Sequence, residues 1–188
     1  MAYPHGLVPI GIFRFPTLMD EQTMRVLRRR DLVLGAAAAA SLASMPAAAA
    51  PPALVVRGAI DGAGPDGRRV FDLAALRAMP QKSFRTTTPW HKQAVTFTGV
   101  PFDAFLRHVG AKGTRLRLIA LNDYAVIADI PELTDNGALL ALAKDGVPLP
   151  VADKGPIFVV FPFDRDPKLR TDNFYLHSVW QLCQIDVL

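Results

Sequence analysis

Hydroxyl, aromatic and imidazole side chains gather in the stretch SFRTTTPWH. Thr86, Thr87 and Thr88 can each donate and accept hydrogen bonds, and Trp90 can offer an apolar wall with one N–H donor. These residue types favour a polar ligand site. The alternative is that the threonines lie at the end of a strand and bind nothing, and that Trp90 packs in the core.

A second polar group stands in the stretch ALNDYAV, at the turn between two expected strands. The amide of Asn122, the carboxylate of Asp123 and the phenol of Tyr124 could together hold a polar ligand. Alternatively, Asn122 and Asp123 only form the turn and Tyr124 packs against the protein. Trp180, the other tryptophan, suits a pocket wall or the core in the same way.

Histidine and cysteine are too sparse for a local metal motif. His91, His108 and His177 have no zinc-type spacing, although His91 and His177 border aromatic, turn-rich segments and could line a pocket. His108 falls on the polar side of a helix. Cys183 is the single cysteine, so an internal disulfide or a site with two thiolates is excluded, and its alternation with Ile185 indicates a small buried side chain.

The elements that must position these residues are short strands interrupted by a few small helices. Asp72 is a predicted helix cap before Leu73, Gly110 is a predicted cap at the end of a helix from residue 102, and a short helix is expected after Pro131. The expected strands fall within residues 51–58, 84–88, 94–100, 115–130, 139–149, 155–161 and 178–188. This order predicts a mixed α+β domain made mostly of strands.

Charge separates an N-terminal extension from the expected domain. Residues 1–50 hold five of the 21 Lys and Arg and three of the 17 Asp and Glu, which leaves sixteen against fourteen from residue 51 onward. The basic residues of this nearly neutral part are scattered among acids, so no nucleic-acid surface is predicted. We expect one domain over residues 51–188.

Residues 24–50 have the pattern of an export signal: arginines, an alanine-rich apolar run, and small residues suited to cleavage near Ala49 or Ala50. Arg29 and Arg30 also resemble the pair of a twin-arginine signal, which exports proteins already folded. The expected location is therefore the periplasm. The alternative is an uncleaved membrane anchor over residues 32–50, in which case the protein would meet the membrane only through this segment.

Several segments together resemble the molybdopterin-binding domain of the sulfite-oxidase family, from about Phe84 to Val187. The similar segments are Phe97–Phe102 with Phe105-Leu106 (F-x-G-V-P before a helix), Asn122-Asp123-Tyr124 (D-G-Y), Asp145–Leu149 (N-G-x-P-L), Gly155-Pro156 (G-x-P), Phe161-Pro162 (V-P) and Val179-Trp180 with Ile185 (K-W-I-x-x-I). Their order implies the α+β fold of that family and, with it, a molybdopterin cofactor.

Two family features are missing from the chain. The resemblance implies a metal-binding cysteine before the F-x-G-V segment, where this chain has FRTTTPWH, and an arginine after G-x-P, where it has Ile157 and Phe158. A threonine hydroxyl stays protonated near neutral pH and cannot replace a thiolate as a soft metal ligand.

Two functional hypotheses follow from this. The first is an exported, non-catalytic module that binds a small molecule, a pterin-like group or a periplasmic partner protein. The second is a molybdopterin-dependent periplasmic oxidoreductase whose metal is coordinated without cysteine. The pocket candidates under both hypotheses are Thr86, Thr87, Thr88, Trp90, Asn122, Asp123 and Tyr124.

Overall fold

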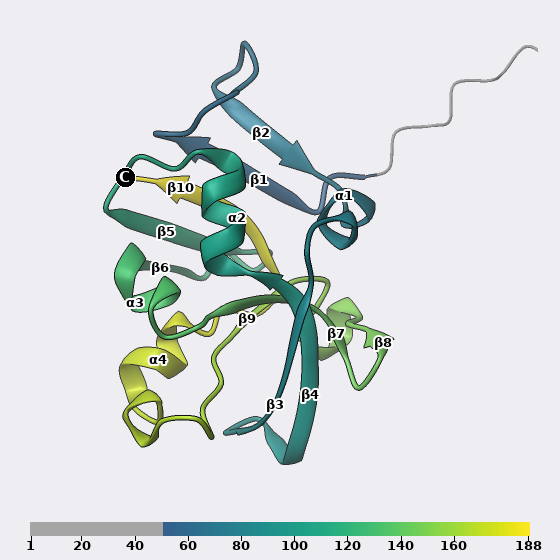
Figure 1. Cartoon of the computed structure of the whole chain (residues 1–188). Coiled ribbons are helices and arrows are strands. Elements are labelled where there is room, and N and C mark those ends of the chain that lie inside the picture. The colour runs from purple at the N-terminus through teal and green to yellow at the C-terminus, as the bar shows by residue number, and fades with distance from the viewer. Residues whose placement is uncertain (1–50) are drawn as a thin grey trace, which may run out of the picture. The chain divides into compact units, whose positions relative to one another are not determined.

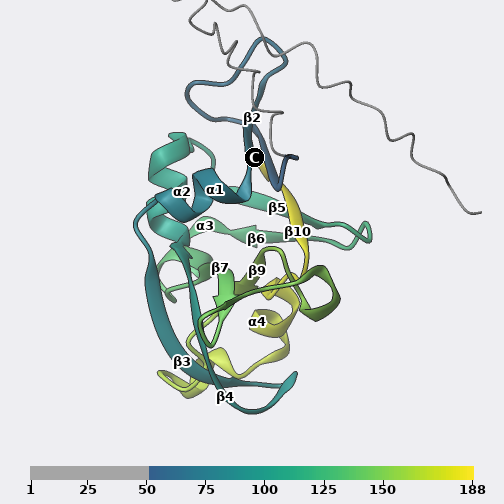
Figure 2. The same ribbon diagram turned by 90° about the vertical axis from the view of Figure 1, so that its right-hand side faces the viewer.

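The computed structural model describes residues 51–188, which form two five-stranded sheets with short helices (Figures 1 and 2). The expected export signal at residues 24–50 lies outside the described residues. In the first sheet the strand order is β2-β1-β10-β5-β6, and only β1 and β10 run parallel. Its strands are β1 Leu54–Gly58, β2 Arg68–Phe71, β5 Arg115–Ala120, β6 Ala125–Asp129 and β10 Leu182–Val187.

The second sheet is antiparallel and is built around a long two-stranded ribbon. Its order is β3-β4-β7-β8, and β9 pairs with the other end of β7. The strands are β3 Lys82–Thr88, β4 His91–Pro101, β7 Leu139–Lys144, β8 Val147–Pro148 and β9 Phe158–Val160. The β3–β4 ribbon extends past the first sheet toward α4, so its tip reaches residues from the C-terminal quarter of the chain (Figures 1 and 2).

The helices are short, and both predicted caps are confirmed. Asp72 accepts a hydrogen bond from the backbone N–H of Ala75 at 2.6 Å and starts the first helix, and Gly110 ends the second with a φ of 61°. The third helix begins one residue before Pro131. The helices are α1 Leu73–Ala78, α2 Phe102–Val109, α3 Ile130–Thr134 and α4 Asp172–His177, with 3-10 turns at Val151–Asp153 and Pro167–Leu169.

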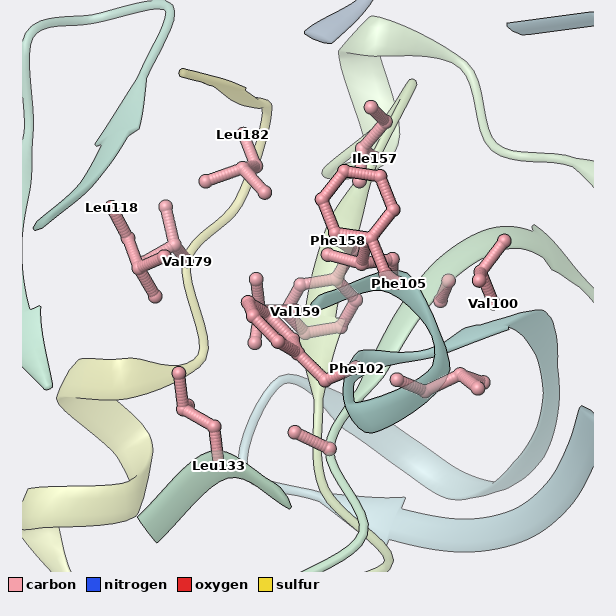
Figure 3. Packing of buried hydrophobic residues seen from close by; sticks show 14 of the residues in the cluster. Val100, Phe102, Phe105, Leu118, Leu133, Ile157, Phe158, Val159, Val179 and Leu182 are labelled. Carbon is pink, nitrogen blue, oxygen red and sulfur yellow. The ribbon is translucent and has the colours of Figure 1, made fainter. Parts of the chain in front are cut away.

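The core lies where α2 meets the strands of both sheets. Phe102 and Phe105 of α2 are fully buried and lie beside Phe158 and Val159 of β9, which are also fully buried (Figure 3). The apolar run of residues 155–161 therefore contains a buried strand, as predicted, but the strand covers only Phe158–Val160. The described part of the chain is α+β and mostly strand, in agreement with the expected class.

The C-terminal segment differs from its prediction as one continuous strand. Residues 178–181 form a turn with Gln181 at a φ of 52°, and β10 begins only at Leu182. The register between β10 and β5 shifts between Leu182 and Gln184. This irregularity leaves Cys183 half-buried and out of step with Ile185, whereas the alternation predicted a buried side chain.

Two further elements had no sequence prediction: strand β2 and helix α4. Helix α4 carries part of the candidate site described below. No helix between residues 51 and 188 has the length and apolar character needed to span a bilayer.

Gly99 is required by the close approach of β4 to β7. A methyl group at this position would lie 2.0 Å from the carbonyl oxygen of Leu140, at a register shift between the two strands. We expect Gly99→Ala to lower the free energy of unfolding by about 1–3 kcal/mol, because backbone atoms must move. Chemical denaturation measures this. Gly64→Ala is the control, since its methyl would meet the flexible Asp66 side chain at 3.2 Å and the Arg68 carbonyl oxygen at 3.5 Å, an ordinary contact distance. Equal effects of the two substitutions would contradict the prediction.

Candidate functional site

An open cleft of about 290 Å³ lies between the tip of the β3–β4 ribbon, the β5–β6 turn and the end of α4. We call it the aromatic cleft, because four of its nine lining residues are aromatic. The lining residues are Trp90, Ala120, Asn122, Tyr124, Tyr175, Leu176, Ser178, Trp180 and Gln181. The cleft thus joins two segments singled out from the sequence to a third, residues 175–181.

Trp90 is the central ring of the cleft. Its ring centre lies 5.4 Å from that of Trp180 at an interplanar angle of 88°, and 6.0 Å from that of Tyr175 at 78°. Behind it, Phe158 and Phe163 contact the indole edge-to-face at 5.8 and 6.4 Å. Trp90 therefore has both of the roles that were alternatives in the sequence analysis: it packs against the core and it lines a cleft.

The β5–β6 turn positions Tyr124 in the cleft. Asp123 has a φ of 64°, a left-handed conformation that aspartate tolerates, and the side-chain oxygen of Asn122 accepts a hydrogen bond from the Tyr124 N–H at 3.3 Å. The Tyr124 hydroxyl donates to the Leu176 carbonyl at 3.0 Å, and burial raises the pKa of this phenol. Asn122 and Tyr124 line the cleft, whereas Asp123 serves the turn and does not.

The three threonines do not line the aromatic cleft. Thr86 is fully buried, and its hydroxyl donates to the Thr87 carbonyl at 3.1 Å and accepts from the Asp164 N–H at 3.0 Å. The Thr88 hydroxyl lies 2.7 Å from Nδ1 of His91 and accepts from the Trp90 N–H at 3.2 Å. These hydroxyls hold the ribbon tip together and position Trp90.

Thr87 points the other way along the strand, where it contacts residues far away in sequence. Its N–H and hydroxyl donate to the two carboxylate oxygens of Asp164 at 2.7 and 2.5 Å, and Arg170 binds the same carboxylate. Thr87 also lines a second cavity of about 300 Å³. The residues that line this second cavity are Thr87, Thr88, Pro89, Phe163, Arg170 and Tyr175, and Tyr175 also lines the aromatic cleft.

Histidines 91 and 177 lie near the cleft but do not line it. Nε2 of His91 is buried without a hydrogen-bond partner among the described residues, and its pKa is lowered by burial and by the nearby Lys154 and Lys144, which favours the neutral ring. His177 is 5% exposed at the end of α4, with Nδ1 at 3.5 Å from Glu132.

Cys183 and His108 do not line the aromatic cleft. The Cys183 thiol donates to the Ile119 carbonyl at 3.5 Å, and burial raises the pKa of this thiol, which disfavours a thiolate. His108 contacts the Arg69 side chain at 3.1 Å on the opposite part of the domain. Within residues 51–188, no three His, Cys, Asp or Glu side chains come together in a metal-binding arrangement.

Sequence reasoning missed most of the C-terminal contribution to the cleft. Tyr175, Leu176 and Ser178 belong to α4 and the turn after it, and neither element was predicted. Asp164 and Arg170 were also missed, because they meet Thr87 across 77 and 83 residues and form no local motif. A cluster of aromatic residues near the end of the chain was the available signal for Tyr175.

No protein-family model matches the chain, and no curated protein matches it in sequence. Its structure is similar to the crystal structure of the sulfane dehydrogenase SoxCD from Paracoccus pantotrophus, with a TM-score of 0.55 and 16% sequence identity. The similarity covers 71% of this chain and 37% of that chain, so the chain spans little more than a third of the length of this neighbour. At this identity the likeness shows a distant relationship in fold.

The contact of Asp164 with Thr87 and Arg170 predicts a pH dependence of stability. The Thr87 hydroxyl, then the Thr87 N–H and the Arg170 guanidinium, hold the pKa of Asp164 below its ordinary value of 3.8. A lowered pKa in the folded state stabilises the fold above the ordinary value, and this contribution is lost as the pH falls through the folded pKa. We expect Asp164→Asn to lower the unfolding free energy by about 1 kcal/mol at pH 7, since the site is partly exposed.

Denaturation of the wild type and Asp164→Asn between pH 7 and pH 2.5 tests this, because the difference between the two curves should shrink as the pH falls below 3.8. Thr87→Val is the matched control: it keeps the carboxylate and removes one donor, so its curve should lie between the other two. A constant difference between wild type and Asp164→Asn over the whole range would contradict the expectation.

Proposed function

We propose that the chain is a binding module built on a sulfite-oxidase-type molybdopterin-domain fold, and that it holds a small ligand in the aromatic cleft without redox turnover. The observation that carries the proposal is the chemistry of the lining. Among the described residues, none that lines the cleft has a thiol, imidazole, carboxylate or amine. The distant likeness to the sulfane dehydrogenase supports the choice of fold.

Two of the three hydroxyl groups in the cleft, those of Tyr124 and Ser178, are poor candidates for catalysis. The Tyr124 phenol already donates to the Leu176 carbonyl, and its raised pKa keeps it protonated near neutral pH. The Ser178 hydroxyl donates to the Phe174 carbonyl at 2.8 Å, and none of the described lining residues can act as its base. Groups that cannot gain or lose a proton near neutral pH can bind and orient a ligand, but they cannot act as general acid and base.

The residues present do not fit a molybdenum cofactor held through a protein thiolate. The resemblance implies a cysteine in the FRTTTPWH segment, and this chain has threonines there whose hydroxyls serve the ribbon tip and Asp164. The single thiol, Cys183, does not line the aromatic cleft and has a raised pKa. This disagreement in donor chemistry supports binding rather than molybdenum catalysis.

The alternative is a molybdopterin-dependent periplasmic oxidoreductase with non-cysteine metal coordination. It is favoured by the fold likeness to a protein named as a dehydrogenase, and by the twin-arginine-like pair Arg29 and Arg30, which is expected of proteins exported after folding. Under both proposals residues 24–50 direct export to the periplasm. The partner is a small molecule or a periplasmic protein.

Metal analysis separates the two proposals. The full chain is expressed in a host that makes the molybdenum cofactor, purified from the periplasm, and analysed for molybdenum and for visible absorption. We expect molybdenum far below one atom per chain and no redox-active absorption band, because no described side chain offers a suitable donor at the cleft. Stoichiometric, redox-active molybdenum would overturn the binding proposal, and recovery only from the cytoplasm would overturn the export proposal.

A further inference from the structure

The angles between the rings of the aromatic cleft restrict the shape of its ligand. Trp90 stands nearly perpendicular to both Trp180 and Tyr175, at 88° and 78°. A flat heterocycle is held best between two parallel faces, and every aromatic pair found among the described residues lies between 55° and 88°. Rings at right angles present walls on several sides of a rounded group instead.

The cleft is also open, and its lining side chains carry no formal charge. Trp180 is 41% exposed and Tyr124 is 39% exposed, so both aromatic rings are accessible to a ligand. The lining carries no basic side chain among the described residues, and the faces of aromatic rings are electron-rich. A cation that enters the cleft therefore meets several π faces and no charged group in the wall.

One ammonium group already uses a ring of this cleft. Nζ of Lys154 lies 4.8 Å from the centre of the Trp180 ring, which is within the range of a cation–π contact. Asp153 lies 3.4 Å from the same Nζ but also pairs with Lys144, so its single carboxylate offsets only one of the two lysine charges. The Trp180 ring therefore already contacts one cation, and the lysine charge that Asp153 does not offset opposes a second, so a ligand cation has to gain enough from the remaining ring faces to outweigh this repulsion.

We infer that the aromatic cleft binds a small quaternary ammonium compound, whose trimethylammonium group packs against the perpendicular rings of Trp90, Tyr175 and Trp180. The inference rests on the proposed binding function and narrows its ligand class. A trimethylammonium group is rounded and weakly hydrated, and it has no N–H donors that would need acceptors in the wall. Asn122 and Gln181, which also line the cleft, then supply amide groups for the polar remainder of the ligand.

Choline and its neutral isostere 3,3-dimethylbutan-1-ol test the inference, because the two differ in charge and hardly in shape. The full chain contains two tryptophans and both line the cleft, so intrinsic fluorescence reports binding directly. We expect choline to bind roughly tenfold more tightly than the isostere. Equal affinities, or binding of neither compound, would overturn the inference. Tighter binding of the flat heterocycle lumazine would overturn it in favour of a stacked ligand.

Two substitutions make the test specific for the rings. Trp180→Leu keeps an apolar side chain but removes a π face, so the preference for choline over the isostere should fall to nearly one, and Trp180→Phe should keep part of it. Leu176→Ala is the matched control, because it removes an aliphatic contact from the same cleft and should weaken both compounds alike. An unchanged preference in Trp180→Leu would contradict the inference. The molybdenum measurement tests the proposed binding function independently of choline. Failure of the ligand inference can therefore be distinguished from failure of the proposed function.

Discussion

The edge-to-face packing of Trp90 is the contact on which the site depends. Trp90 lies just after Thr88 at the tip of the β3–β4 ribbon, and its indole touches rings from β9, from the loop after it, from α4 and from the turn before β10. These elements all belong to the C-terminal part of the chain, far from Trp90 in sequence, and each of them contacts its side chain. Without it, the ribbon would have no large apolar contact at its tip, and the cleft would lose its inner wall.

Polar contacts at the ribbon tip fix where Trp90 stands. The strand alternates, so the buried Thr86 and Thr88 lie on one face and the exposed Thr87 on the other. The Thr88 hydroxyl contacts His91 and accepts a hydrogen bond from the Trp90 N–H, which shapes the turn. Thr86 and Thr87 bind Asp164 and so attach the ribbon to the loop after β9. The three threonine hydroxyls therefore position an aromatic residue. They resemble a ligand-binding site in the sequence, but their hydrogen bonds are made within the protein.

Structural features that depend on contacts within a few residues were predicted correctly from the sequence, whereas features that depend on contacts between distant segments were not. Asp72, Gly110 and the Asn122-Asp123 turn act through contacts within a few residues, so their types alone indicated helix ends and a strand turn. By contrast, the turn at residues 178–181 interrupts a segment that alternates like a strand, and the residues around Gln181 are held by the distant Lys154 and Ile157 carbonyls. The same turn places Trp180 in the cleft, which explains why its role stayed open in the sequence.

The fold and the lining of the cleft carry different information about function. A backbone can stay similar at 16% identity because its core needs only apolar side chains of suitable volume, such as Phe102, Phe105 and Phe158. Chemistry at a site needs particular atoms, and one missing thiolate is enough to remove a metal ligand. The likeness to a dehydrogenase therefore supports the architecture, while the uncharged aromatic wall around Trp90 is the feature that a function for this chain has to explain.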